Sequence, residues 1–372
     1  MTQPKLFEPL TLRSLTLTNR VSVAPMCQYS AIDGVPQDWH MQHYGAMAAS
    51  GPGLITIEAT GVTPDGRISP RCLGLYDDAT EAAFTRLVGA LKSFGNSHVA
   101  IQLGHAGRKG SGSPPVEGPG PARHSGWPTL SASEIPFDSN WPNPKAATED
   151  DLARIRQGFV DAAGRALRAG FDAIEIHSAH GYLLHQFLSP ITNHRTDAYG
   201  GSLDNRMRFP LSVVEAVRAV WPADKPLGIR ISATDWVEGG WDIDEAVIYA
   251  KAFKAAGIDY VCVSSGGLVP YAKIPIGPGY QIHLAKRIRQ EVEIVTRAVG
   301  LIATPQQAEA ALAEGAADMI AIGRGFLDNP RWVWHAAEAL GAEIAYPPQY
   351  MAVRGKIWPG AAIARPREIA AE

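Results

Sequence analysis

Short apolar runs alternate along this chain with longer stretches whose apolar positions repeat at the spacing of an amphipathic helix, and this alternation constrains the fold most. The eight runs that we interpret as strands are residues 21–25, 54–58, 99–103, 173–177, 227–231, 260–263, 294–297 and 319–322. Parallel strands need crossover connections and burial on both faces, and the pattern provides both. The sequence therefore predicts an α/β protein whose eight strands close into a (β/α)8 barrel, a TIM barrel.

The stretches between the runs carry helix boundary signals. The clearest helical stretches are residues 81–94, 150–169, 206–220, 243–256, 305–314 and 330–340. Glycine ends several of them directly before the next strand, at Gly170, Gly257 and Gly315, as expected at such junctions. The alternative fold, a doubly wound sheet, usually carries the pattern GxGxxG after its first strand, and this chain lacks that pattern.

Residues 104–147 interrupt this rhythm with a long stretch rich in Pro, Gly and Ser. Loops of this length inside a compact domain are usually functional or disordered. Because this stretch leaves the C-terminal end of the third strand, we expect a lid over the active face; a plain surface insertion is the alternative. We predict one barrel domain over residues 1–345 and a tail over residues 346–372 that contacts a partner subunit or is partly disordered.

Composition narrows the classes of function. The formal net charge is −3 and basic residues are scattered, so we expect neither a nucleic-acid partner nor an anionic membrane surface. The N-terminus lacks an apolar signal core, and no apolar run reaches the ~18 residues of a spanning helix, which predicts a cytoplasmic protein. Cys27, Cys72 and Cys262 are too widely spaced for a disulfide framework or a zinc or iron–sulfur site.

Polar residues stand where such a barrel places its active site, at the C-terminal ends of the strands. The fourth strand ends in His177, followed by His180 and Tyr182. Two imidazoles can polarise a carbonyl, and a phenol with an ordinary pKa near ~10 can act as a general acid. Metal ligation and a structural role for the histidines remain alternatives at this point. Tyr29, after the first strand, is a candidate second wall or donor.

Three further residues indicate a bound phosphate. Gly300 and Gly323 follow the seventh and eighth strands, where barrels commonly bind phosphate groups, and Arg324 adds a fixed positive charge. Glycines that merely permit tight turns are the alternative. Cys27 could be a nucleophile, but we favour a weak S–H contact that tunes a bound cofactor.

Taken together, these motifs resemble the Old Yellow Enzyme family of flavin-dependent ene-reductases. The matching stretches are residues 24–29, 58–60, 102–109, 177–183, 193–202, 205–206 and 323–324. The resemblance runs from about residue 6 to about residue 348. With a cysteine at position 27, the first motif resembles the bacterial branch of the family that contains xenobiotic reductases.

The resemblance implies FMN bound at the barrel mouth of residues 1–345. By position in the motifs, FMN would contact Ala24, Pro25, Met26, Cys27 and Ala59 along its ring system, Gln102 and Arg230 at its pyrimidine edge, and Gly300, Gly323 and Arg324 at its phosphate. It also implies that His177 and His180 bind a substrate carbonyl oxygen, that Tyr182 donates a proton and that Tyr29 contacts the substrate.

The implied activity is NADPH- or NADH-dependent reduction of small-molecule activated alkenes, namely α,β-unsaturated carbonyl or nitro compounds. The alternatives are a dienoyl-CoA-type or other flavin reductase, a metal-dependent barrel lyase and a non-catalytic flavoprotein. Relatives in this branch can send a C-terminal Arg or Trp into a neighbouring site. We therefore expect a homodimer or homotetramer, with Arg354 and Trp358 as candidates for that contact.

Overall fold

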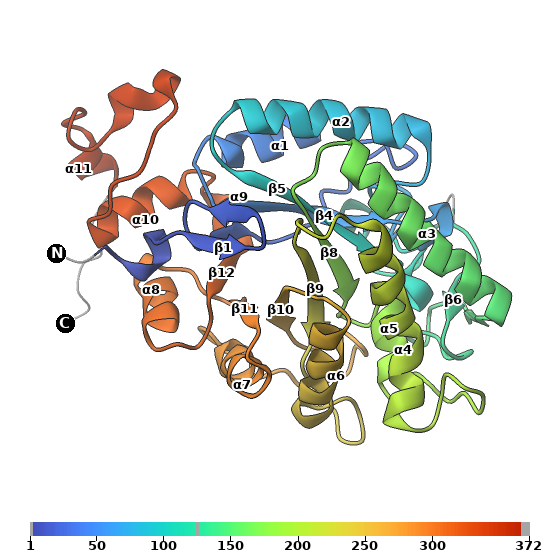
Figure 1. Ribbon diagram of the computed structural model, residues 1–372. Coiled ribbons are helices and arrows are strands. Elements are labelled where there is room, and N and C mark those ends of the chain that lie inside the picture. The colour runs from blue at the N-terminus through green and yellow to red at the C-terminus, as the bar shows by residue number, and fades with distance from the viewer. Residues whose placement is uncertain (1–2, 124–125, 366–372) are drawn as a thin grey trace.

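The predicted barrel is present. The computed structural model describes residues 3–123 and 126–365, and in this part of the chain eight parallel strands pair in chain order and close on themselves (Figure 1). The strands are β3 (Val21–Val23), β4 (Leu54–Gly61), β5 (His98–Gly104), β8 (Ala173–Ser178), β9 (Leu227–Ser232), β10 (Tyr260–Ser264), β11 (Val295–Ala298) and β12 (Met319–Ile322). Closure is made by the last strand on the first, where Ile320 pairs with Val21. The (β/α)8 fold class is therefore confirmed.

Helices surround the barrel and follow the strands in turn (Figure 1). They are α1 (Asp38–Ala48), α2 (Asp78–Ser93), α3 (Glu149–Arg168), α4 (Leu183–Leu188), α5 (Leu203–Val220), α6 (Ile243–Ala255), α7 (Ile282–Val292), α8 (Pro305–Ala313), α9 (Arg324–Asp328), α10 (Trp332–Leu340) and α11 (Ala361–Ala364). Side chains that accept backbone N–H groups fix several starts: Thr148 caps α3 and Asp242 caps α6. The six helical stretches predicted from sequence all correspond to helices, with ends that differ by a few residues.

An N-terminal hairpin closes the bottom of the barrel. Strands β1 (Leu10–Leu12) and β2 (Leu15–Leu17) pair antiparallel, and Leu12 and Leu17 are buried in one apolar cluster with the first residues of β4, β8, β10 and β12. Removing this apolar surface from water stabilises the hairpin against the barrel. Because the N-terminal ends of the strands are covered, ligands have access from the C-terminal ends.

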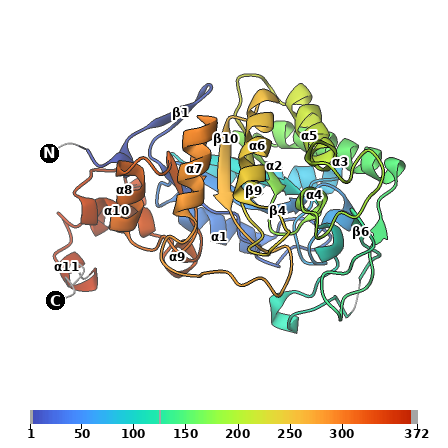
Figure 2. The ribbon, with the colours of Figure 1, turned by 90° about the horizontal axis from the view of Figure 1, so that it is seen from below.

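The excursion over residues 104–147 packs near those C-terminal ends. Arg108 donates hydrogen bonds to the carbonyls of Ile135 and Pro136 within the excursion and of Leu268 in the loop after β10. Figure 2 shows the excursion, with β6 (Leu130–Ser131), at the side of the molecule toward which the arrow of β10 points. This position is the one expected of a lid, while its action as a lid stays a prediction.

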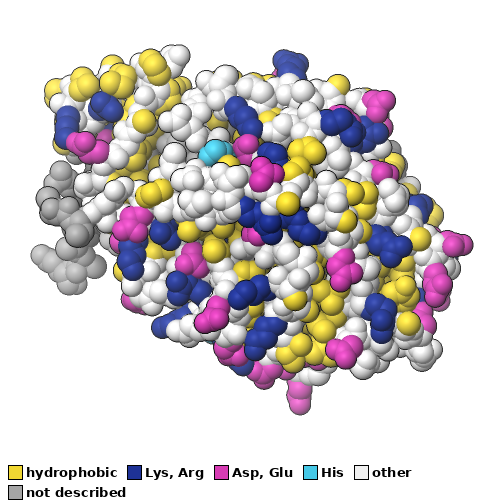
Figure 3. Space-filling view, in the orientation of Figure 1, with side chains coloured by type: hydrophobic (Ala, Val, Ile, Leu, Met, Phe, Trp, Pro, Cys, Tyr) yellow, Lys and Arg dark blue, Asp and Glu magenta, His cyan; other side chains and the backbone are white. Residues whose placement is uncertain are grey.

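The tail folds back on its own chain as far as it is described. Tyr346 and Tyr350 pack on the Trp334 ring of α10, with ring centroids 4.6 and 5.3 Å apart, and the Arg354 guanidinium lies 5.3 Å from the centre of the Tyr346 ring. The Trp358 side chain is 39% exposed, and Figure 3 shows apolar side chains gathered on this part of the surface. Contact of the tail with a partner subunit stays a prediction, and residues 366–372 lie outside the described part.

Candidate active site

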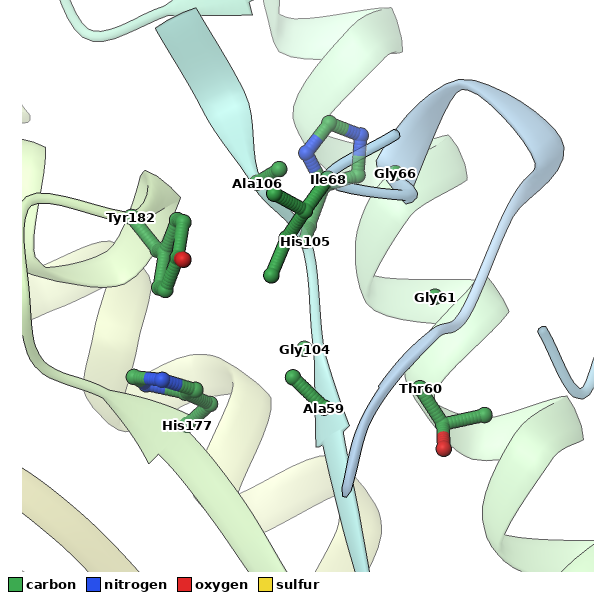
Figure 4. A pocket seen from close by; sticks show the side chains of 10 residues that line it. All are labelled: Ala59, Thr60, Gly61, Gly66, Ile68, Gly104, His105, Ala106, His177 and Tyr182. Carbon is green, nitrogen blue, oxygen red and sulfur yellow. The ribbon is translucent and has the colours of Figure 1, made fainter. Parts of the chain in front are cut away.

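A cavity opens at the C-terminal ends of β4, β5 and β8 (Figure 4). Its lining residues are Ala59, Thr60, Gly61, Gly66, Ile68, Gly104, His105, Ala106, His177 and Tyr182. Figure 4 shows the side chains of His177 and Tyr182 on one side of the space and those of Ala59 and His105 across from them. The cavity thus brings together one predicted oxyanion donor, the predicted proton donor and one predicted flavin contact.

The protonation of His177 follows from its hydrogen bonds. Its Nδ1 accepts the N–H of Ala179 at 3.2 Å, so the ring proton of the neutral imidazole is on Nε2. Burial, together with the positive charge of Arg230, lowers the pKa of His177 well below its ordinary value. His177 is therefore neutral at pH 7 and presents an N–H donor rather than a full positive charge.

A left-handed turn at His180 and Gly181 brings the site residues together. Their φ angles are +59° and +72°, and for a side chain larger than glycine such a conformation costs about 1–3 kcal/mol. Two hydrogen bonds hold the backbone of His180 in this turn. Its N–H donates to Ser232 Oγ at 2.9 Å, and its carbonyl accepts from Lys109 Nζ at 2.8 Å. As a result, the His177 ring centre lies 5.3 Å from that of His180 and 4.8 Å from that of Tyr182.

The Nε2 of His180, unlike that of His177, already has a hydrogen-bond partner among the described residues. This nitrogen lies 2.8 Å from Ser264 Oγ, and Nδ1 remains to meet a ligand. Burial lowers the pKa of His180 well below its ordinary value, with a further contribution from the positive charge of Arg230. The two histidines are adjacent, as predicted, but His180 is not among the residues that line the cavity of Figure 4.

Tyr182 is kept protonated by its surroundings. Burial raises the pKa of its phenol well above the ordinary value, and the ionisable groups Cys27 and Tyr29 raise it further. The Lys109 ammonium lies 5.1 Å from the centre of the Tyr182 ring. A phenol that resists ionisation can act as a proton donor but not as a base at neutral pH.

The loop after β3 places Cys27 and Tyr29 close enough to Tyr182 to influence its pKa. The loop is fixed by Glu58, whose carboxylate accepts the N–H of Gln28 at 2.7 Å. A hydrogen bond with Cys72, followed by burial, raises the pKa of Cys27 well above its ordinary value. A thiol that resists ionisation is a poor nucleophile, which disfavours covalent catalysis by Cys27, and its contact with a cofactor stays a prediction.

The surroundings of Arg230 show whether this end of the barrel can hold a cofactor. Its side chain is only 8% exposed, its Nε has no hydrogen-bond partner, and it forms no ion pair with any residue that the structure describes. A buried charge without a partner costs several kcal/mol, on the order of 3–5 when a partner is removed. The site is therefore built for a group that offers acceptors or negative charge, and the pyrimidine edge of FMN meets that need.

The predicted phosphate residues lie beside the same barrel end. A Cβ atom added at Gly323 would lie 3.5 Å from Met26 Sδ and 3.9 Å from Ala24 Cβ. The residue after the eighth strand therefore lies against the loop that is predicted to contact the flavin. Gly300 has φ +120°, a conformation that favours glycine. Arg324 is exposed and has no ion pair among the described residues. These residues fit a phosphate group, although they do not line the cavity of Figure 4.

Two residues of the site received no role from the sequence. His105 lines the cavity, and burial lowers its pKa to about 4. Lys109 is half-buried, donates to the His180 and Gly267 carbonyls, and has a pKa lowered to about 7, mainly by desolvation. Both follow the third predicted strand, at the end of the barrel where the sequence places the site. Their burial depends on the excursion and on the loop after β10, which the sequence did not place.

The buried histidines predict acid sensitivity of the fold. His43 and His105 have pKa values lowered to about 4, mainly by burial, and those of His177 and His180 are also lowered. Because unfolded imidazoles bind protons near pH 6.5, their stabilising contribution is present above that pH and is lost as the pH falls from 6.5 toward 4. We expect the free energy of unfolding to drop by about 2 kcal/mol per fully buried histidine between pH 6.5 and 5.

Urea unfolding of the FMN-loaded enzyme at fixed FMN concentration measures this loss at pH 7.5 and pH 5. The variant His105→Gln should lose less stability over that interval than the original chain. Equal stability at both pH values would contradict the assignment of these histidines as buried and neutral.

The (β/α)8 barrel, with the His177–Tyr182 cavity at the C-terminal ends of its strands, is compatible with a flavin-dependent oxidoreductase. A family model described as the NADH:flavin oxidoreductase / NADH oxidase family matches residues 5–343. The chain belongs to this family, the Old Yellow Enzyme family, and is an NAD(P)H-dependent enzyme that uses FMN. Membership sets aside the metal-dependent lyase and the non-catalytic flavoprotein.

Curated relatives cover nearly the whole chain. An NADPH dehydrogenase of Geobacillus thermodenitrificans is 48% identical over 347 residues, which is 93% of this chain and 97% of the relative. An NADPH dehydrogenase of Bacillus subtilis is 42% identical over 348 residues, or 93% of this chain and 98% of the relative. These relatives agree with the class of NAD(P)H-dependent oxidoreductases to which the chain belongs.

Solved structures agree with this class. Morphinone reductase superposes with a TM-score of 0.78 at 31% identity, covering 94% of this chain and 93% of that chain. A 2-naphthoyl-CoA reductase superposes with a TM-score of 0.82 at 24% identity, but this chain covers only 52% of it, so that likeness shows the fold alone. In the described residues, no helix is long and apolar enough to cross a membrane.

Proposed function

We propose that this enzyme reduces the C=C bond of α,β-unsaturated carbonyl compounds, and of nitro compounds with the same polarity. The observation that carries the proposal is the pair of protonated donors on one cavity, the His177 Nε2–H and the Tyr182 hydroxyl (Figure 4). Bound FMN, reduced by NADPH or NADH, supplies the hydride for the β-carbon.

The histidines act on the carbonyl oxygen. A neutral His177 donates its Nε2–H to that oxygen and stabilises the negative charge that develops there when hydride arrives at the β-carbon. His180 adds a second donor from Nδ1 in the tautomer whose Nε2 accepts the hydroxyl proton of Ser264. Donors fixed before the reaction need no rearrangement at the moment when the charge forms, which is the source of their catalytic effect.

Tyr182 supplies the proton to the α-carbon. Its hydroxyl is protonated throughout the neutral range because burial raises its pKa. The carbon that it protonates is a strong base, so a donor with a high pKa is adequate for transfer. Lys109, 5.1 Å from the ring centre, can then offset the negative charge of the phenolate until water restores the proton.

The cofactor contacts are proposed from the fit described above. Arg230 and Gln102 hold the pyrimidine edge of FMN, residues 24–27 and Ala59 border its ring system, and Tyr29 forms part of the substrate wall. Gly300, Gly323 and Arg324 bind the phosphate through backbone N–H groups and a guanidinium.

An anaerobic stopped-flow experiment tests the proposed activity. NADPH should bleach the oxidised flavin spectrum, and 2-cyclohexenone should then restore it with formation of cyclohexanone. Recovery of the spectrum with oxygen but not with the enone would overturn the proposed substrate class. The same experiment with a nitroalkene tests the second class of substrate.

We expect Arg324 to contact only the phosphate group of FMN. Replacement Arg324→Ala should raise the Kd for FMN by about 10- to 100-fold, because hydrogen bonds to a charged group are worth more than neutral ones. Fluorescence titration of the apoprotein measures this change.

Riboflavin, which lacks the phosphate, is the control ligand. It should bind the original chain and the Arg324→Ala variant equally well, and Arg324→Lys should give an intermediate Kd for FMN because the charge remains without the planar fork. An equal loss for riboflavin and FMN would contradict the phosphate assignment.

A further inference from the structure

A buried polar cluster lies inside the barrel, and the proposed chemistry does not use it. Glu175 of β8 and Arg297 of β11 form an ion pair with no exposed side-chain surface. Arg297 also donates to Thr56 Oγ1 of β4 at 3.1 Å. Gln102 of β5 donates from Nε2 to Glu175 Oε1 at 2.8 Å. Four strands therefore contribute to one hydrogen-bonded unit, and one member, Gln102, is a proposed flavin contact.

The charges in the cluster fix which way the Gln102 amide points. An arginine in a protein is always protonated, so its paired carboxylate at Glu175 is ionised and can only accept hydrogen bonds. An amide carbonyl facing that carboxylate would place two acceptors against each other in the buried interior of the barrel. The NH₂ group of Gln102 must therefore face Glu175, and its carbonyl oxygen must face away.

The carbonyl oxygen of Gln102 is left for a ligand. In the described part of the chain, no protein donor hydrogen-bonds to Gln102 Oε1, and this oxygen is not among the fully enclosed atoms without a partner. The pyrimidine ring of a flavin carries one N–H donor, at N3, between two carbonyl acceptors. A locked amide that presents oxygen matches that donor, whereas an amide turned by 180° would oppose it with its own N–H groups.

We propose that Glu175 and Arg297 are positioning residues for the cofactor: they lock the Gln102 amide so that its carbonyl oxygen accepts the N3–H of FMN. The inference rests on the proposed contact of Gln102 with the pyrimidine edge. Stability alone does not require this pair, because buried ion pairs can often be replaced by apolar residues without loss of stability.

The variant Glu175→Gln tests the lock with almost no change of shape. A glutamine at position 175 can offer either its oxygen or its NH₂ group, so the Gln102 amide is free to turn. We expect the Kd of the apoprotein for FMN to rise by about 3- to 10-fold, as for one neutral hydrogen bond. The matched control Thr56→Val removes another hydrogen bond of the same cluster but keeps the carboxylate, and its Kd for FMN should stay unchanged.

A double-mutant cycle separates positioning from a general loss of structure. If Glu175 acts through Gln102, then Glu175→Gln should have no further effect on the Kd for FMN in a Gln102→Ala background. Additive losses in the cycle, or an unchanged Kd in Glu175→Gln alone, would overturn the inference. An unchanged Kd in Gln102→Ala alone would instead show that the proposed flavin contact is wrong.

Arg297 is left without its partner in Glu175→Gln, and this variant could fail to fold. In that case the cycle is run with Glu175→Gln combined with Arg297→Met, which removes the unpaired charge together with the lock. Thermal unfolding of each apoprotein shows that the variants are folded before their affinities are compared. The same expected and contrary outcomes then apply to this combined variant.

Discussion

Replacement Tyr182→Phe should slow the reduction of 2-cyclohexenone by about 10²–10⁴-fold while the reduction of bound FMN by NADPH stays nearly unchanged. The phenol lines the cavity together with His177, and burial keeps it protonated. Only the half-reaction that consumes the enone needs a proton on carbon. Anaerobic stopped-flow spectroscopy measures the two half-reactions separately by following the flavin absorbance.

The control for this prediction is Tyr29→Phe, which removes a second phenol from the same neighbourhood. We expect a smaller loss in the enone half-reaction, because Tyr29 is proposed to contact the substrate rather than to donate the proton. Equal losses in both half-reactions of Tyr182→Phe would contradict its role as the proton donor. So would a loss in Tyr29→Phe larger than that in Tyr182→Phe.

Replacement His177→Ala should lower the rate of enone reduction by about 10²–10³-fold, the usual cost of removing one oxyanion donor. The donor is the Nε2–H, since Nδ1 accepts from Ala179. The rate of flavin reduction by NADPH should change much less, because no oxyanion forms in that half-reaction. Single-turnover measurements over a range of enone concentrations separate weaker binding from slower chemistry.

The variant His177→Gln keeps an N–H donor near the position of Nε2 and should recover part of the lost rate. The pH dependence gives a second check. Because the pKa of His177 is held well below 6.5, protonation of this ring should not alter the enone half-reaction between pH 7 and 8. A rate that changes with an imidazole-like pKa of about 6.5 would show that His177 acts in its charged form.

The positions of the site side chains depend on a backbone turn that other segments of the chain hold in place. His180 adopts a left-handed conformation, and the carbonyl and N–H of this residue are held by Lys109 and Ser232. A side-chain atom on Gly181 would lie 2.5 Å from the Gly267 carbonyl oxygen, so the turn is also closed from the side of the loop after β10. The strain is therefore offset by contacts from three separate segments of the chain.

The sequence by itself determined the barrel and the end at which the site lies. Strand and helix periodicity are local properties, so all eight strands could be predicted, and strand ends such as His177 could be assigned to the C-terminal face. The residues that cap and end the helices act within a single turn, which is why the glycine that follows α3, Gly170, could be predicted from its neighbours.

Only the tertiary structure decided how the site residues are protonated and held. The Ser264 hydroxyl at His180 and the burial of Lys109 come from segments far away in the chain. The pairing of Glu175 with Arg297 joins residues 122 positions apart. Hydrogen-bond partners and burial depend on distances across the closed barrel, and a pattern of neighbouring residues does not contain those distances.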